Sequence, residues 1–329
     1  MPKVYQFNRT GGPEVLELHE VEVAAPGAGE VRIRVKAIGL NRAEVMYRSG
    51  QYVIEPRFPA RLGYEAAGVV DAVGAGVAGF APGDEVSVVP AFSFADYGMY
   101  GELVNAPAHA VVKHPRGLSF VDAAAAWMMF VTAYGALVEL GNLRAGETVL
   151  VRAASSSVGL AAIQIARMAG AVPVALTRGS GKRQALLDAG AAHVIATQEQ
   201  DLVAEVARIT GGAGARMAFD PVGGPEAARL FKALCAGGIF FQYGALDTGD
   251  IPVPVMDLLG KHLTLRGYEL FEITTDPERL GKARDFVNAG LASGQLRPVV
   301  DKTFAFEDMA AAHRYMESNA QVGKIVVTL

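Results

Sequence analysis

Residues 147–171 read ETVLVRAASSSVGLAAIQIARMAGA, where an apolar strand pattern runs through a turn of small residues directly into an apolar helix pattern. The same alternation of strand and helix patterns continues to residue 268. Alternating βα units over about 150 residues predict a doubly wound parallel sheet. The expected strands cover residues 148–152, 172–177, 193–195, 216–220, 238–243 and 263–268, and the expected helices cover 120–140, 158–169, 182–189, 202–210 and 225–235.

The turn in this stretch departs from the usual glycine-rich nucleotide-binding fingerprint, because only its last glycine is present. Its residues are Ser155, Ser156, Ser157, Val158 and Gly159. Backbone N–H groups at a helix start lack internal partners and carry partial positive charge, so small side chains there allow a phosphate to approach. Serine is also a favoured N-cap in ordinary helices. The turn is therefore a candidate phosphate site, with a plain helix cap as the alternative.

The chain on either side of this region has a different pattern. From the N-terminus to about Lys113, short alternating strands are broken by Gly and Pro, which predicts a mainly β unit. These strands are expected at residues 21–23, 31–39, 66–74, 84–89 and 108–114. The tail returns to this unit with expected helices at 277–293 and 306–318 and a strand at 324–328. We expect one domain formed by residues 1–122 and 266–329, interrupted by a second domain at 123–265.

Composition excludes several functional classes. The net charge of −4 and the absence of a Lys/Arg block argue against nucleic acid and anionic membranes as partners. The N-terminus has no apolar export segment, and the apolar run at 123–138 is shorter than a membrane span. Cys235 is the only cysteine, which forbids an intrachain disulfide, suits the cytoplasm, and is expected to fill the core. Cysteine-rich zinc sites are excluded too, and His109 and His114 lack the spacing of metal ligands, so we expect no metal.

Several segments, in order, resemble the medium-chain dehydrogenase/reductase superfamily, in its zinc-lacking quinone oxidoreductase (zeta-crystallin-like) branch. The segments are GLNRAEVMYRSGQY at 39–52, PARLGYEAAGVVDAVG at 59–74, GDEV at 83–86, DPVGG at 220–224 and GKIVV at 323–327. The resemblance implies a Rossmann domain inserted into a GroES-like, mainly β catalytic domain. It also implies that Asn41 and Tyr64 stand where zinc-dependent relatives have a cysteine and a histidine ligand, while Glu65 matches a retained glutamate.

The end of the second expected strand indicates which dinucleotide binds. NAD specificity normally relies on an acidic residue about 20 residues past the turn. Here Thr177 and Arg178 are followed by Lys182, and a cationic loop suits a 2′-phosphate. We therefore predict NADPH, with a solvated helix face as the alternative role of Lys182 and its neighbour Arg183. At Thr197, similar quinone reductases often have a tyrosine that helps to hold the 2′-phosphate.

The resemblance also implies a set of residues around the nicotinamide and the substrate. Asn41, Tyr52 and Tyr64 are the catalytic candidates, as hydrogen-bond donors to the oxygen that gains negative charge when hydride arrives. Tyr47 follows Met46, where relatives often have a tyrosine, so either residue could stack on the cofactor. Further cofactor-binding candidates are Met46, Thr132, Gly244, Ala245, Tyr268, Leu270 and Lys324, of which Tyr268 and Leu270 could instead lie at a subunit contact.

The expected activity is NADPH-dependent, zinc-independent reduction of a quinone or an α,β-unsaturated carbonyl. Reduction of an enoyl thioester is an alternative, favoured by arginines that cluster near the expected cleft loops. A non-catalytic NADPH-binding or sensor protein is a second alternative, because a Rossmann unit serves both roles. A homodimer is expected through the edge strand near residues 263–268, since exposed sheet edges tend to be paired or covered. The clustered arginines are Arg42, Arg48, Arg57 and Arg61.

Overall fold

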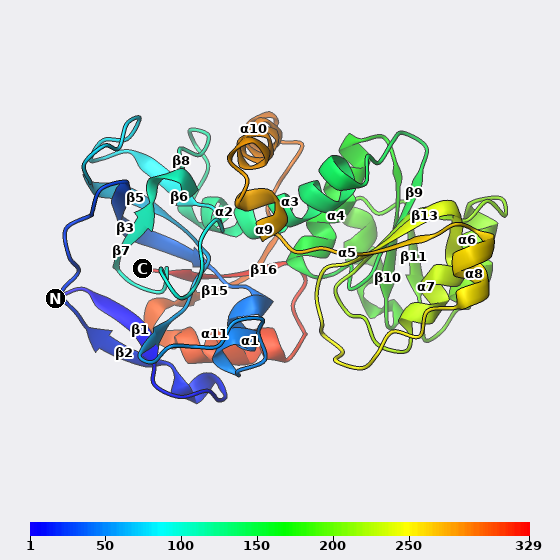
Figure 1. Cartoon of the computed structure of the whole chain (residues 1–329), viewed down its shortest axis with the longest axis horizontal. Coiled ribbons are helices and arrows are strands. Elements are labelled where there is room, and N and C mark those ends of the chain that lie inside the picture. Colours follow the sequence, from blue (N-terminus) through cyan, green and yellow to red (C-terminus); the bar gives the residue numbers. More distant parts are fainter. The chain divides into compact units, whose positions relative to one another are not determined.

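The computed structural model describes all residues from 1 to 329, and the chain divides into two compact units (Figure 1). The first unit comprises Met1–Met128 and Thr274–Leu329, and the second comprises Met129–Ile273. Both breaks fall six to eight residues beyond the expected ones, as counted from 122 and 265. At the first break the reason is packing, because Ala123, Ala124 and Ala125 are buried in a core cluster of the first unit. The second unit is thus one continuous segment between the two segments of the first.

The first unit is built on two β-sheets. A seven-stranded sheet has the order β15-β16-β3-β5-β6-β8, with β7 paired to β3, and a three-stranded sheet has the order β2-β1-β4. The C-terminal strand returns to the start of the chain, because Val326 in β16 pairs antiparallel with Gly39 in β3. The strands are β1 (Lys3–Phe7), β2 (Glu17–Glu20), β3 (Glu30–Gly39), β4 (Ala60–Arg61), β5 (Glu65–Val73), β6 (Glu85–Val88), β7 (Leu103–Pro107), β8 (Val111–Val112), β15 (Val300–Ala305) and β16 (Lys324–Thr328).

The longest helix of the first unit begins at an N-cap that the sequence shows. Asp276 accepts hydrogen bonds from the backbone N–H groups of Glu278 and Arg279, and Pro277 takes the first helical position, so this helix starts where we expected. The helices are α1 (Arg42–Arg48), α2 (Phe120–Ala125), α10 (Pro277–Ser293) and α11 (Met309–Glu317), with short turns η1 (Pro13–Val15), η2 (Ala108–Ala110) and η5 (Phe306–Asp308).

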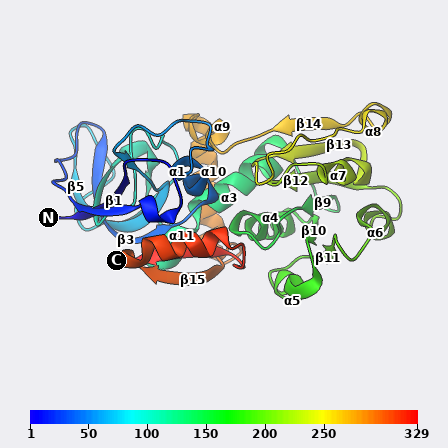
Figure 2. The same cartoon turned by 90° about the horizontal axis from the view of Figure 1, so that it is seen from below.

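The second unit is a six-stranded, wholly parallel sheet flanked by helices (Figure 2). Its order, β11-β10-β9-β12-β13-β14, is the 3-2-1-4-5-6 order of a Rossmann fold, confirming the predicted doubly wound sheet. The strands are β9 (Thr148–Val151), β10 (Val172–Thr177), β11 (His193–Ala196), β12 (Ala215–Asp220), β13 (Leu234–Gln242) and β14 (Thr264–Gly267). The helices are η3 (Gly135–Leu140), α4 (Ser157–Met168), η4 (Ser180–Lys182), α5 (Arg183–Asp188), α6 (Leu202–Ile209), α7 (Ala227–Ala233) and α8 (Val255–Gly260).

Two helices span the breaks between the units: α3 (Trp127–Tyr134) and α9 (Phe271–Thr274). The single helix expected at 120–140 is in fact three segments, α2, α3 and the π-helix η3. The break between α2 and α3 coincides with a buried carboxylate, because Glu65 Oε2 accepts hydrogen bonds from the N–H groups of Trp127 and Met128. An acceptor at these N–H groups satisfies a new helix start, so the sequence pattern alone overestimates the length of the helix.

Other differences from the sequence-based expectations are local. Residues 21–23 are not a strand, and the strand at this place is β2, which ends at Glu20. β1, β4, β7 and β15 were not predicted. Cys235 is only half-buried on β13, so its predicted role as core filler is wrong. None of the helices combines the length and the hydropathy that crossing a membrane would require.

Candidate functional site

The start of α1 is held by a buried carboxylate. Glu44 Oε2 accepts a hydrogen bond from the Asn41 N–H at 2.7 Å, as in a capping box. Both amide hydrogens of Asn41 face internal acceptors: Gly39 O at 3.1 Å, Glu65 Oε1 at 3.1 Å and Glu44 Oε1 at 3.4 Å. Asn41 is 7% exposed. In this arrangement the Asn41 amide has no hydrogen left to donate to a substrate oxygen, which was its expected role.

Lys324 lies beside the same asparagine. Its ammonium donates to Asn41 Oδ1 at 2.6 Å and forms an ion pair with Glu65, and both charged side chains are at most 1% exposed. Glu65 also receives the two N–H donors at the start of α3, so every charge here has polar partners. The resemblance implied that Lys324 contacts the cofactor. Two of its three ammonium N–H donors are used by Asn41 and Glu65.

The two positions that match zinc ligands in relatives are Asn41 and Tyr64. Zinc sites in proteins use thiolate, imidazole and carboxylate ligands. Here the side chains are an amide, a phenol and the Glu65 carboxylate, and the Lys324 ammonium already pairs with that carboxylate. No group of three or more His, Cys, Asp or Glu residues could hold a metal ion. The residues at this place do not fit a zinc ion.

A second branch of polar contacts leaves Glu44. Its Oε2 accepts a hydrogen bond from the Tyr100 hydroxyl at 2.6 Å, and that hydroxyl lies 3.0 Å from His313 Nε2. Burial raises the pKa of Glu44 to about 7, although the hydrogen bonds from Tyr100 and the backbone and the Lys324 charge act in the other direction. Burial, with the Arg48 and Arg42 charges, lowers the pKa of His313 to about 3. We call these six residues the buried network: Asn41, Glu44, Glu65, Tyr100, His313 and Lys324.

Tyr64 links this network to an aromatic cluster. Its N–H donates to Glu44 Oε1 at 3.1 Å, and its ring stacks on Phe94 with centroids 3.6 Å apart. The Tyr64 hydroxyl lies 3.5 Å from that of Tyr52, which is half-buried. The Tyr47 ring is 1% exposed and stacks on Phe94. Of the two candidates for stacking, only Met46 is partly exposed.

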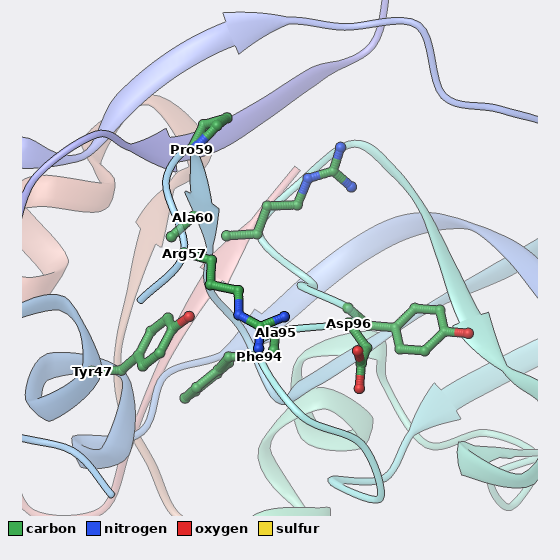
Figure 3. A pocket seen from close by; sticks show the side chains of 9 residues that line it. Tyr47, Arg57, Pro59, Ala60, Phe94, Ala95 and Asp96 are labelled. Atoms are coloured by element: carbon green, nitrogen blue, oxygen red, sulfur yellow. The ribbon is translucent and has the colours of Figure 1, made fainter. Parts of the chain in front are cut away.

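The four clustered arginines have different environments. Arg42 donates to Met316 O and Asn319 Oδ1, and Arg48 is 1% exposed and pairs with Glu317. Arg57 and Arg61 line a cavity of about 170 Å³ together with Asp96 (Figure 3). Arg42 and Arg48 are therefore held by contacts within the protein, whereas Arg57 and Arg61 share their cavity with the Asp96 carboxylate. The basic entrance of an enoyl-thioester reductase stays a prediction, with Arg57 and Arg61 as its remaining candidates.

In the second unit, the serine turn starts α4 at the carboxyl end of β9. Ser156 is the N-cap, because its Oγ accepts a hydrogen bond from Gly159 N at 3.1 Å. The N–H groups of Ser157 and Val158, at the first two helical positions, have no intrahelical acceptor. A Cβ at Gly159 would lie 2.6 Å from Ala154 O, so the turn requires glycine there. Ser156 is thus the predicted helix cap, while the N–H groups of Ser157 and Val158 have no hydrogen-bond acceptor within the helix.

The DPVGG segment forms a second turn at the same edge of the sheet. Asp220 is fully buried, pairs with Arg152 at 2.8 Å and accepts the N–H of Val222 at 2.7 Å. A Cβ on Gly244 would lie 2.8 Å from Pro221 O, so the DPVGG segment passes close to the residues that follow β13. The neighbouring Ala245 is exposed. The ion pair and these contacts thus hold the backbone of residues 220–223, which lies against Gly244, one of the predicted cofactor positions.

The exits of β10 and β11 run side by side. The parallel register continues past both strands, with Thr197 N donating to Thr177 O at 2.8 Å. Arg178 is exposed and its guanidinium makes no hydrogen bond or ion pair, whereas Lys182 Nζ lies 3.3 Å from Ser155 Oγ. Thr197 donates its hydroxyl to Thr177 O at 3.3 Å. We call residues 177–182 the β10 loop.

The remaining cofactor candidates of the second unit are buried. Thr132 is 6% exposed, Tyr268 is 5% exposed and Leu270 is 6% exposed. The Tyr268 ring packs edge-on against Phe241, and its hydroxyl would clash with any Cβ at Gly135. All three side chains are thus largely covered within the chain.

Some residues at these places were missed in the sequence. Glu44 could have been found, because Asn41 followed three residues later by glutamate matches a capping box. Tyr100 and His313 carry no local signal, since their contact joins positions 213 residues apart. Glu199 was also overlooked, although it follows the third strand of the sheet and its carboxylate binds the β10 loop.

Comparison with known proteins matches both units to families. The zinc-binding dehydrogenase family matches residues 157–288, and the alcohol dehydrogenase GroES-like domain matches residues 27–116. The quinone oxidoreductase of Lama guanicoe is 33% identical over 330 residues, covering 99% of this chain and 97% of the relative.

Several solved structures match over the whole chain, and two of them show the range of their names. The Escherichia coli quinone oxidoreductase complexed with NADPH has a TM-score of 0.90 at 31% identity, with 99% of this chain and 100% of that chain covered. A structure named NAD-dependent alcohol dehydrogenase has a TM-score of 0.89 at 34% identity, with both chains fully covered. The predicted resemblance is confirmed: the chain belongs to the medium-chain dehydrogenase/reductase superfamily, in the quinone oxidoreductase branch.

Proposed function

We propose that this protein is an NADPH-dependent, zinc-independent reductase of quinones or α,β-unsaturated carbonyls. The observation that carries the proposal is the pair of phenols, Tyr52 and Tyr64, beside residues that do not fit zinc. Without a Lewis acid, hydrogen-bond donors must stabilise the negative charge that develops on the acceptor oxygen. The two hydroxyls, 3.5 Å apart, are suitable donors, and they replace the Asn41 amide as the best candidates.

The buried network positions these donors. Glu44 holds the start of α1 through the Asn41 N–H and the start of β5 through the Tyr64 N–H. Lys324 and Glu65 fix the Asn41 side chain in turn. We assign Asn41 and Lys324 a positioning role, in which they keep Tyr64 in one orientation.

The second unit fits a dinucleotide. The uncommitted N–H groups of Ser157 and Val158 and the glycine-dependent packing at Gly159 suit a pyrophosphate. The exposed Arg178 suits a 2′-phosphate. A bound nicotinamide would supply the hydride. Among the related structures, two are complexed with NADPH and one is named NAD-dependent, so the preference proposed here for NADPH rests on Arg178 and its loop.

An acceptor panel with each cofactor tests the proposal. Purified protein should oxidise NADPH with 1,2-naphthoquinone or a small enone, without added metal and unaffected by a chelator. Turnover that is lost on chelation contradicts the zinc-independent mechanism. Turnover confined to enoyl thioesters would instead favour the alternative reductase. Cofactor binding by fluorescence without turnover of any acceptor would favour the non-catalytic binder.

We also propose that the protein is a homodimer, located in the cytoplasm as its single cysteine suggests. β14 is the edge of the Rossmann sheet, and an unpaired edge tends to be covered. Beside it in sequence, α8 exposes Val255, Met256 and Leu259 by 60%, 80% and 64%, and Leu265 on the edge strand is 42% exposed. A second copy, which brings the same strand and the same apolar side chains, would cover both features.

Light scattering after size-exclusion chromatography tests the dimer. The natural chain should elute with twice the chain mass, and Leu265→Lys combined with Met256→Lys should elute as a monomer. Val53→Lys, which changes a side chain that is 88% exposed in the first unit, is the control. A dimer that survives the double substitution contradicts the proposed interface.

A further inference from the structure

A carboxylate lies against the β10 loop where the proposed cofactor requires donors. Because the register of β10 and β11 continues past the strands, Gln198 N donates to Arg178 O at 3.0 Å, and the next residue, Glu199, arrives beside Gly179 and Ser180. Glu199 Oε1 accepts hydrogen bonds from Ser180 N at 2.8 Å and from Ser180 Oγ at 3.2 Å. A Cβ on Gly179 would lie 3.2 Å from the same oxygen.

These contacts place a carboxylate beside the cations of the β10 loop. Arg178 is an uncommitted cation, and Lys182 lies within 3.3 Å of Ser155 in the serine turn. Between them in sequence, the N–H and the hydroxyl of Ser180 are the donors that a phosphate oxygen would use, and Glu199 occupies both. A 2′-phosphate that takes these donors must displace a carboxylate of its own sign. A ribose 2′-OH, in contrast, can donate to a carboxylate.

We propose that Glu199 is a specificity-determining residue that weakens binding of the 2′-phosphate and so narrows the preference for NADPH over NADH. This inference rests on the proposed function, because it concerns the cofactor of the same site. Glu199 is exposed, so its effect on a bound phosphate is an interaction between solvent-exposed charges and should decrease with salt. Arg178 attracts the 2′-phosphate and Glu199 repels it. The site is therefore expected to bind both NADPH and NADH.

Dissociation constants, measured by isothermal titration without any acceptor, test this role. The probes are NADPH, NADH, adenosine 2′,5′-bisphosphate and adenosine 5′-monophosphate. Glu199→Gln keeps an acceptor for Ser180 but removes the charge. We expect it to bind NADPH and the bisphosphate about five- to tenfold more tightly at low salt, with NADH within about twofold. Raising the salt concentration to about 0.5 M should remove most of the gain.

Two further variants separate charge from structure. Glu147→Gln removes the same charge at the amino end of β9, the opposite end of the sheet from the β10 loop, and should change no dissociation constant. Glu199→Ala removes both the charge and the acceptor. A purely structural role predicts that the alanine variant loses affinity for both dinucleotides while the glutamine variant matches the natural protein, and that result overturns the inference. If no variant, nor the natural protein, binds either dinucleotide, the proposed function itself fails.

Discussion

The buried network of the first unit and the β10 loop of the second unit both contain charged side chains. Those of the network are buried, whereas Arg178 of the loop is exposed to solvent. In the buried network, Lys324 and Glu65 are at most 1% exposed and have several polar partners. In the β10 loop, Arg178 is exposed and has no partner. Charges in the interior cannot lose a partner without a large cost, whereas exposed charges are screened and can be exchanged. We therefore expect substitutions in the network to affect folding and substitutions in the loop to affect ligand choice.

The largest expected effect is that of Lys324→Met. It leaves the Glu65 carboxylate buried without its cation, and breaking such a pair costs about 3–5 kcal/mol of unfolding free energy. Urea denaturation of the two proteins measures the loss. The double variant Lys324→Met/Glu65→Gln should recover part of it, because the uncompensated charge is gone. A loss of less than about 1 kcal/mol in the single variant would mean that the interior tolerates the lone carboxylate.

The next effect concerns pH. Glu44, whose pKa is raised to about 7, contributes stability that is lost as pH rises between its unfolded value of 4.5 and 7. His313, whose pKa is lowered to about 3, contributes stability that is lost as pH falls from 6.5 to 3. Between pH 4.5 and 6.5 the two slopes oppose each other, because folding leaves the number of bound protons unchanged.

His313→Gln should reveal how the titration of Glu44 alone changes the unfolding free energy with pH. Glutamine can still reach the Tyr100 hydroxyl, but it does not titrate. Relative to the natural protein, the variant should lose up to about 1.4 kcal/mol of unfolding free energy per pH unit from pH 4.5 to 6.5. Urea midpoints at several pH values give the comparison. Parallel pH profiles of the unfolding free energy in the two proteins would show that the titrations of Glu44 and His313 do not offset each other.

Tyr64→Phe should remove a donor without disturbing the network, because the Tyr64 contact with Glu44 is made by its backbone N–H. We expect kcat with 1,2-naphthoquinone to fall about 10²-fold while the thermal midpoint stays unchanged. Tyr5→Phe, whose hydroxyl bonds Glu307 O elsewhere in the first unit, is the control for loss of a phenol. An unchanged kcat would shift the donor role to Tyr52 or to solvent.

The smallest effect is expected in the loop. Arg178→Asp should weaken NADPH binding about tenfold and leave the unfolding free energy within about 0.5 kcal/mol, because the guanidinium has no partner in the protein. Titration of both dinucleotides into each protein measures the preference. A preserved NADPH preference means that the loop cation does not recognise the phosphate. A large loss of stability would remove the contrast between loop and network.

The parts predictable from sequence are those with a repeating local signal. The strands of the Rossmann sheet and the helix Pro277–Ser293 follow from apolar periodicity and from the Asp276 cap. The serine turn is recognisable because strand, turn and helix are contiguous. The resemblance added Asn41 and Tyr64 as positions to examine, but it could not show that the Asn41 amide is already fully bonded.

The unpredicted parts depend on contacts between distant positions. Tyr47 and Met46 are adjacent in sequence, and only packing against Phe94 decides that Tyr47 is core. Glu199 faces Ser180 because two parallel strands share a register. The break before α3 likewise depends on Glu65, 62 positions from Trp127.

By itself, the sequence determined the alternation of strands and helices, the inserted second unit and the family, because these depend on local periodicity and on motifs read in order. The tertiary structure alone decided which polar groups are committed and which are available. Asn41 and Lys324 bond to each other in the buried network, whereas Arg178 is exposed on the loop that Glu199 contacts. The physical reason is that a hydrogen bond or an ion pair is a property of two positions in space. Burial and partners, rather than residue type, determine what a charge can do.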